Sequence, residues 1–139
     1  MIAGTTRLVA LLGHPVAHSL SPRMQNAAFA ALALDLAYVA FDVAPDRFEE
    51  AVRSLVELGF VGANVTAPHK RAAAALAGSG GPSVNTLVFR DGGIEGHSTD
   101  AAVLAGLTPA RPAIVGGGGS AAAFARALPH ARTFERRGD

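Results

Sequence analysis

The chain of 139 residues has no cysteine, no tryptophan and one tyrosine, and its formal net charge at pH 7 is only +1. The absence of cysteine excludes disulfides and thiol chemistry and suits the reducing cytoplasm. The near-neutral charge gives no reason to expect nucleic acid as a partner. The apolar run at residues 9–12 is broken by Gly13 and Pro15 and is too short for a signal sequence or a membrane span. We therefore expect a cytoplasmic protein without membrane or nucleic-acid partners.

Half of the residues are hydrophobic, so the chain can bury the core of one ordinary domain. In its first half, strands are predicted at residues 7–12, 38–43 and 60–65. Helices are predicted at residues 22–34, capped by Ser21, and from Pro45 to the stop signal Gly59. The connections are long enough for helical crossovers, which predicts an α/β fold with a largely parallel sheet flanked by helices. The first helix would carry Met24, Ala28, Ala31 and Leu32 on one face.

The second half continues with a helix from Lys70, a strand at residues 83–89, a hairpin turn at 91–93 and a returning strand at 94–96. A short helix then ends near Gly106, and residues 108–112, with two prolines, form a boundary linker. Beyond it, a strand at 113–115, a helix to Leu128 and a strand at 132–135 are predicted. We therefore divide the chain into a first domain, residues 1–107, and the start of a Rossmann-like dinucleotide-binding domain, residues 108–139.

Residues 116–121, called here the glycine-rich loop, fit the pattern G-x-G-x-x-A between a strand and a helix. In this pattern the first glycine permits a tight turn, the second lets the backbone approach a pyrophosphate, and the small last residue allows close helix packing. Four consecutive glycines also suit a hinge, but the flanking strand and helix favour a nucleotide. About twenty residues further, Arg136 and Arg137 favour the 2′-phosphate of NADP, whereas Glu135 would suit the free 2′-hydroxyl of NAD. A solvated charged tail is the third interpretation.

Lys70 follows a predicted strand and Pro68, in the first turn of a helix, where the helix dipole disfavours a cation. When a carbonyl is reduced by hydride, an ammonium beside its oxygen supplies both charge and proton. A nearby carboxylate favours the charged amine, and Asp100 is the candidate. The pair predicts a general acid for reduction and a reverse reaction that is faster at alkaline pH. The alternative is a solvated lysine after a turn.

Small polar residues lie near the predicted strand ends, where ligands bind in open α/β sheets. Their hydroxyl and amide groups suit a carboxylate and several hydroxyls on a small ring, although each alone is more often a cap or turn residue. They are Ser19, Ser21, Asn64, Thr66 and Asn85. The histidines show no metal-binding pattern, so no metal is predicted and none of them is given a role.

Four segments in one order resemble a known family: residues 13–22 (GHPVAHSLSP), 62–70 (GANVTAPHK), 84–86 (VNT) and 96–100 (GHSTD). The chain resembles the shikimate dehydrogenases. This resemblance implies an NADPH-dependent oxidoreductase that reversibly reduces 3-dehydroshikimate to shikimate, in the biosynthesis of aromatic amino acids. Two alternatives stay open, a dehydrogenase for quinate or shikimate that uses NAD, and a non-catalytic module that binds shikimate.

The resemblance also implies roles for single residues. Lys70 and Asp100 would be the catalytic pair and would also contact the substrate, Ser19 and Ser21 would bind its carboxylate, and Asn64, Thr66 and Asn85 would bind ring hydroxyls. Gly116, Gly118, Gly119, Ser120 and Ala121 would hold the pyrophosphate of NADP, with Arg136 at its 2′-phosphate. Family members continue for about as many residues again, so only the first part of the cofactor domain is expected here. A homodimer is an open option.

Overall fold

A computed structural model of the chain describes residues 2–135. Its main body is a five-stranded sheet in the order β2-β1-β3-β4-β5. The strands are β1 (Arg7–Gly13), β2 (Leu36–Asp42), β3 (Gly62–Val65), β4 (Thr86–Arg90) and β5 (Gly93–His97). β1 pairs in parallel with β2 and β3, whereas β4 runs antiparallel to β3 and β5. The predicted α/β fold with a largely parallel sheet is confirmed, since β4 alone runs against the other four strands.

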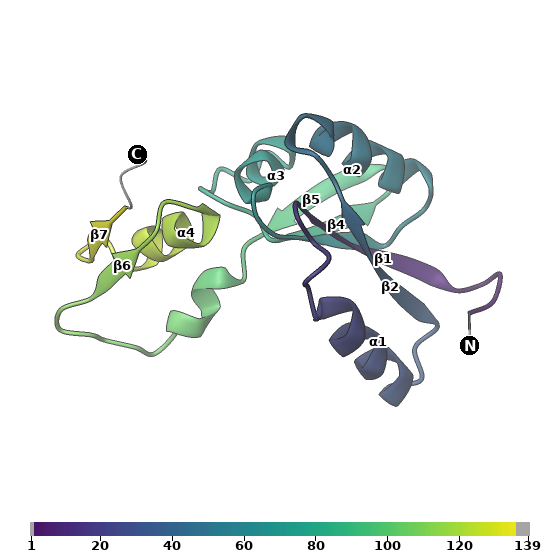
Figure 1. Cartoon of the computed structure of the whole chain (residues 1–139), viewed down its shortest axis with the longest axis horizontal. Coiled ribbons are helices and arrows are strands. Elements are labelled where there is room, and N and C mark those ends of the chain that lie inside the picture. Colours follow the sequence, from purple (N-terminus) through teal and green to yellow (C-terminus); the bar gives the residue numbers. More distant parts are fainter. Residues whose placement is uncertain (1, 136–139) are drawn as a thin grey trace.

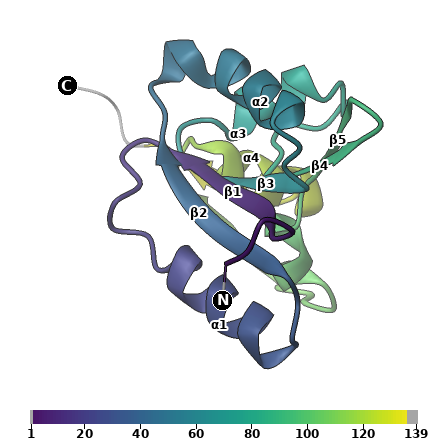
Figure 2. The same cartoon turned by 90° about the vertical axis from the view of Figure 1, so that its right-hand side faces the viewer.

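Two crossover connections place helices on both faces of this sheet. α1 (Ser21–Ala31) connects β1 to β2, and η1 (Pro45–Arg47) with α2 (Phe48–Glu57) connects β2 to β3. Because β2 and β3 flank β1 on opposite sides, crossovers of one hand put α1 and α2 on opposite faces. Figures 1 and 2 show α2 and α3 (Lys70–Leu76) on one face and α1 on the other. β1 is thus covered on both faces, which explains its almost continuous apolar sequence.

The main core fills the space between the sheet, α2 and α3. Successive strand residues face opposite sides, so Leu12 of β1 points into this core while Leu11 points toward α1. α2 contributes an apolar stripe to this core, formed by its buried residues Phe48, Val52 and Leu55. The buried residues of this core are Ala10, Leu12, Val43, Phe48, Val52, Leu55, Phe60, Ala63, Val65, Ala73, Ala74, Val84 and Leu87. This core fixes the sheet edge on which the polar residues lie.

β4 and β5 form a hairpin with the two-residue turn Asp91-Gly92. Arg90 pairs with Gly93, and the φ angles of Asp91 and Gly92 are +50° and +76°. Positive φ at both central positions gives a turn whose twist matches that of the strands, and aspartate and glycine tolerate it. The predicted hairpin is confirmed. It brings the chain back to the edge where β3 ends, and there η2 (Asp100–Leu104) begins.

The last elements form a small unit of their own, the β6–α4–β7 unit. It consists of β6 (Ala113–Val115), α4 (Gly119–Ala127) and β7 (Arg132–Phe134), and β6 pairs with β7 in parallel. The glycine-rich loop connects β6 to α4, as the sequence predicts. Figure 1 shows this unit at one end of the molecule, where α4 contacts α3 and η2. Among residues 2–135, every helix is too short or too polar to cross a bilayer.

α1 differs from its prediction. Leu20 occupies the N-cap position and Ser21 is already helical, so the predicted cap at Ser21 is wrong. The helix also ends earlier, at Ala31, because Ala33 adopts a φ of +53° and turns the chain toward β2. Its apolar face is not a core face: no residue of α1 is buried. The Asn26 side chain also ties the helix to β2, since it donates to the Tyr38 carbonyl oxygen at 2.9 Å and accepts from the Tyr38 N–H at 2.8 Å.

Candidate active site

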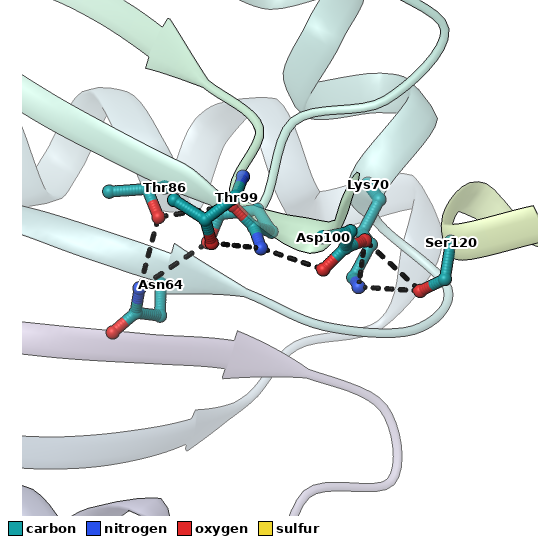
Figure 3. Close-up of polar contacts among 7 residues, drawn as sticks. Asn64, Lys70, Thr86, Thr99, Asp100 and Ser120 are labelled. Atoms are coloured by element: carbon teal, nitrogen blue, oxygen red, sulfur yellow. Dashed lines mark hydrogen bonds and ion pairs between the residues drawn. The ribbon is translucent and has the colours of Figure 1, made fainter. Parts of the chain in front are cut away.

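The predicted polar residues gather at the sheet edge where β1 and β3 end. Asn64 lies in β3, and Lys70 is the first residue of α3, so its predicted place in the first turn of a helix is confirmed. Because β4 is antiparallel, its first residue Thr86 pairs with Asn64, and Asn85 precedes it at the same edge. β5 returns there and delivers Asp100 at the start of η2. Figure 3 shows the row of polar contacts that results.

Lys70 and Asp100 form a largely buried ion pair. Lys70 Nζ lies 2.7 Å from Asp100 Oδ2, and the side chains are 15% and 14% exposed. Burial raises the pKa of Asp100, but the hydrogen bond and charge of Lys70, with hydrogen bonds from Ser120 and Asn85, outweigh it and hold the pKa below its ordinary value. The aspartate is therefore a carboxylate at neutral pH. The structure brings together the two residues that the sequence analysis pairs.

A serine from the second unit joins this pair. Ser120 Oγ lies 2.9 Å from Lys70 Nζ and 3.0 Å from Asp100 Oδ2. Gly119 permits this approach, because a Cβ added to it would lie 2.7 Å from Lys70 Cβ. The family resemblance implies that Ser120 lies at a pyrophosphate, and it does not foresee this side-chain contact. Only the packing of α4 against α3 and η2 reveals it.

Asn85 holds Asp100 in place. Its Nδ2 donates to Asp100 Oδ1 at 2.7 Å and to Thr99 Oγ1 at 2.8 Å, while its Oδ1 accepts from the Thr99 N–H at 3.0 Å and from Thr86 Oγ1 at 3.1 Å. These four bonds use the two donors and two acceptor positions of the amide. Asn85, expected to bind a ring hydroxyl, is therefore fully engaged by the protein and would contact a substrate only by exchanging a partner.

Asn64 is oriented by a buried tyrosine. The Tyr38 hydroxyl donates to Asn64 Oδ1 at 2.8 Å, so the amide turns its Nδ2 toward Thr86 Oγ1 at 3.3 Å and the Asn85 carbonyl oxygen at 3.4 Å. Burial raises the pKa of Tyr38 to about 12. Because these bonds from Asn64 Nδ2 are long, this amide can exchange its protein partners for a ligand oxygen more readily than the other donors at this edge. The sequence singled out Asn64 but missed Tyr38, which reads as an ordinary strand residue.

Ser19 and Ser21 lie after β1 and outside this network. Ser19 Oγ accepts a hydrogen bond from the Ser21 N–H at 3.2 Å. Within residues 2–135, no side-chain hydrogen bond joins either serine to the Lys70–Asp100 pair. They border the same sheet edge, because β1 and β3 are parallel neighbours that end there.

Asp42, at the end of β2, fastens the loop that carries these serines. One carboxylate oxygen lies 2.6 Å from His14 Nδ1, and the other accepts from the Val16 N–H at 3.2 Å. The His14 hydrogen bond is the main reason that the pKa of Asp42 lies below its ordinary value. His14, to which the sequence gave no role, is thus part of the loop's support.

His69 is also structural. It is 2% exposed, its Nε2 lies 2.8 Å from the Val43 carbonyl oxygen, and its ring stacks on Phe48 with centroids 4.7 Å apart. Burial is the main reason that the pKa of His69 lies below its ordinary value. The residue before Lys70 therefore anchors the start of α3 to the core.

A cleft of about 550 Å³ separates the glycine-rich loop from the chain around Lys70. Arg71 spans it, with Nη2 donating to the Gly117 carbonyl oxygen at 2.9 Å. Glu135 lies beside the same glycine, because a Cβ added to Gly117 would be 3.1 Å from its carboxyl carbon. Arg136, predicted at a 2′-phosphate, lies outside the described residues. The lining residues are Thr66, Ala67, Pro68, Lys70, Arg71, Val115, Gly116, Gly117, Gly118, Gly119, Ser120 and Ala121.

The family described as the shikimate dehydrogenase substrate binding domain matches residues 11–97, more than half of the chain. The chain belongs to this family. The match includes Asn64, Lys70 and Asn85 and ends before Asp100.

Curated relatives extend the likeness beyond that domain. A shikimate dehydrogenase (NADP(+)) of Anaeromyxobacter dehalogenans is 49% identical over 141 residues, covering 92% of this chain and 51% of the relative. One of Rubrobacter xylanophilus is 48% identical over 151 residues, covering 98% of this chain and 53% of the relative. The chain thus spans about half the length of the curated relatives it matches.

Solved structures of the family show the same fold. Shikimate 5-dehydrogenase from Thermus thermophilus, in complex with NADP(H) and shikimate, has a TM-score of 0.78 and 32% identity, with 94% of this chain and 56% of that chain covered. The enzyme from Listeria monocytogenes, in complex with shikimate and NAD, has a TM-score of 0.78 and 33% identity, with 99% and 54% covered. Both likenesses reach past the substrate-binding domain into the β6–α4–β7 unit.

Proposed function

We propose that this chain carries the substrate half and the first cofactor-binding elements of an NADP-dependent shikimate dehydrogenase. The observation that carries the proposal is the Lys70–Asp100 pair, 2.7 Å apart, with Ser120 of the glycine-rich loop 2.9 Å from the same ammonium. An acid–base pair and a nucleotide-type loop thus adjoin one cleft. The family membership and the relatives named above support shikimate and 3-dehydroshikimate as the substrates.

Lys70 would move the proton of the reaction. In the reduction of 3-dehydroshikimate, the ammonium donates its proton to the carbonyl oxygen as the alcohol forms. In the oxidation of shikimate, the neutral amine takes the hydroxyl proton. Asp100 stabilises the ammonium. We further propose that Asn64 and Thr66 contact ring hydroxyls and that Ser19 and Ser21 bind the substrate carboxylate.

The residues present fit a dinucleotide. The cleft lies in the usual size range of ligand sites, and four glycines that line it leave the backbone free of side chains. When bound, NADP exchanges a hydride with the substrate. Gly116, Gly118, Gly119, Ser120 and Ala121 would hold its pyrophosphate through backbone N–H groups. We keep the division at residues 1–107 and 108–139, which the two separate sheets support. The cytoplasmic location and the homodimer stay predictions.

The test is the absorbance of reduced nicotinamide when the chain is mixed with shikimate and NADP at alkaline pH. We expect the absorbance to rise, and Lys70→Ala to lower kcat about 100-fold or more with little change in KM. Arg53→Ala, which removes an exposed cation on α2, is the control and should keep the rate. No rise, with shikimate binding intact by calorimetry, would identify a binding module and contradict the enzymatic proposal.

A second candidate is the same reaction with NAD. The Glu135 carboxylate beside Gly117 favours it, because an acidic residue at this place can bind the 2′-hydroxyl that NAD has and NADP lacks. Initial rates with NADPH and NADH at equal concentration separate the candidates. Glu135→Gln should weaken the use of NADH selectively if this carboxylate reads the ribose. A rate with NADH equal to or above that with NADPH would overturn the preference for NADP.

A further inference from the structure

Ser120 reaches out of its own helix to the Lys70–Asp100 pair. Serines at helix starts commonly bond to the backbone of their own first turn, yet no side chain caps α4 and its N-cap residue is Gly118. The Ser120 hydroxyl instead contacts two charged groups on α3 and η2, at 2.9 and 3.0 Å. Figure 3 shows the three side chains meeting at the end of the row nearest the glycine-rich loop.

The three groups form a closed triangle of hydrogen bonds. Lys70 Nζ donates to Asp100 Oδ2 at 2.7 Å and to Ser120 Oγ, whose own proton goes to the same Asp100 oxygen. An ammonium has three donors. Two are directed by Asp100 and Ser120, so the third has one remaining direction, which is available to a substrate oxygen. Without the serine, two of the three donors would be undirected.

The sequence places glycine where this triangle needs it. A Cβ on Gly119 would lie 2.7 Å from Lys70 Cβ and 3.3 Å from Ser83 Cβ, so any larger residue would push α4 away from α3. A Cβ on Gly118 would meet nothing within 4 Å. Of these two neighbouring glycines, Gly119 is therefore the one that the contact between the two units requires.

We propose that Ser120 is a positioning residue for the Lys70–Asp100 pair: its hydroxyl holds the ammonium from the side of the glycine-rich loop and aims it at the substrate. The inference rests on the proposed function for its catalytic meaning, whereas the contact itself is a property of the folded chain. The cofactor loop and the acid–base pair are thereby joined by side-chain bonds. A ligand that binds at the glycine-rich loop would therefore change the position of the Lys70 ammonium.

The composition provides a direct probe. Lys70 is the only lysine of the chain, so lysine labelled with ¹³C at Cε gives one carbon signal in the NMR spectrum of the full chain. Its two Hε protons have different chemical shifts when the side chain is held in one rotamer and become nearly degenerate when the side chain samples several rotamers. The same signal also reports the ionisation of Asp100, because the Asp100 carboxylate lies 2.7 Å from Lys70 Nζ. Within residues 2–135, Lys70 is the charged group that lowers the pKa of Asp100.

Ser120→Ala should reduce the separation of the two Hε signals, because Asp100 alone then holds the ammonium. It should also move the half-point of their acid titration to higher pH, because the hydrogen bond from Ser120 lowers the pKa of Asp100. Ser120→Thr retains a hydroxyl and should restore both values. Gly119→Ala keeps the serine but displaces it, so it should behave like Ser120→Ala. Gly118→Ala and Ser54→Ala, the latter on the outer surface of α2, are the controls and should leave the Lys70 signal unchanged.

The inference is overturned if Ser120→Ala and Gly119→Ala both keep the wild-type separation and half-point. Neither measurement needs substrate or cofactor, so it decides the role of Ser120 even if the chain shows no turnover and the proposed function fails. Where the chain turns over, Ser120→Ala should lower kcat about threefold to tenfold, the loss expected for one hydrogen bond, and leave the KM for shikimate unchanged.

Discussion

The five-stranded unit supports its polar edge on a continuous core, whereas the β6–α4–β7 unit has almost none. In the first unit, residues from Ala10 to Leu87, on three strands and two helices and in the segments between them, pack into one cluster. In the described part of the second unit, Ile114 and Ala123 are the buried hydrophobic residues, and Val115 is 84% exposed. Because apolar burial is the main favourable term in folding, the first unit has a source of stability that the second lacks.

Polar contacts across the boundary hold the second unit in place. Ser120 binds Lys70 and Asp100, and Arg71 donates to the Gly117 carbonyl oxygen at 2.9 Å. The partners in the first unit are fixed by their own secondary structure. The glycine-rich loop therefore takes its order from the five-stranded unit, and not the reverse.

The largest expected effect separates the stabilities of the two units. Phe48→Ala, which empties a 2% exposed position in the main core, should lower the free energy of unfolding by about 3–5 kcal/mol. Tyr38 is the only tyrosine and the chain has no tryptophan, so tyrosine fluorescence during urea unfolding reports on the five-stranded unit alone. Ile114→Ala is the matched variant in the second unit.

Ile114→Ala should leave the tyrosine-detected transition within about 0.5 kcal/mol of the wild type, because distant and separately packed sites act independently. Circular dichroism should show the unfolding of the β6–α4–β7 unit as a smaller transition at a lower urea concentration than the tyrosine-detected transition. An equal shift of the tyrosine transition by both variants would contradict the comparison, since it would mean that the two units unfold as one.

His69 makes the stability of the five-stranded unit depend on pH, because this buried histidine belongs to the core of that unit alone. His69→Phe keeps the stacking on Phe48 but leaves the buried Val43 carbonyl oxygen without its donor, which should cost about 1–3 kcal/mol. Urea midpoints across pH for the wild type and this variant test the expectation. His130→Gln, an exposed histidine of the second unit, is the control.

The sign of the pH effect follows from the pKa of His69, which burial holds below its ordinary value of 6.5. The unfolded chain therefore binds a proton at this residue before the folded chain does. The stability contribution is fully present above pH 6.5 and is lost as the pH falls through the folded pKa. A wild-type midpoint that stays flat across this window, or a slope that survives in His69→Phe, would be incompatible with this role.

The sequence predicts local structure best where a residue type has one dominant conformational or packing role. The alternation of strands and helices, the Asp91-Gly92 turn and the strand before the glycine-rich loop follow from periodicity and glycine geometry alone. The limits of α1 could not be predicted, because Ala33 adopts a positive φ that alanine rarely takes. Contacts between distant segments were also out of reach. Tyr38 with Asn64, and Ser120 with Lys70, are 26 and 50 residues apart and have no local signal.

The smallest expected effect concerns Tyr38, which joins the core of the first unit to its polar edge. Tyr38→Phe removes one hydrogen bond to Asn64 and should cost about 0.5–1.5 kcal/mol of stability. It should also raise the KM for shikimate more than it lowers kcat, because the freed Asn64 amide loses its fixed orientation while the Lys70–Asp100 pair is untouched. The pH dependence gives an independent check, since burial raises the pKa of Tyr38 to about 12.

An unfolded tyrosine loses its proton near pH 10, so the contribution of Tyr38 to stability is present below pH 10 and is lost as the pH rises toward 12. The single tyrosine makes this visible, because the phenolate absorbance of the folded chain should appear only near pH 12 or together with unfolding. Ionisation near pH 10 in a chain that circular dichroism shows to be folded would mean that the hydroxyl is open to water. The link from core to site that Tyr38 provides would then be absent.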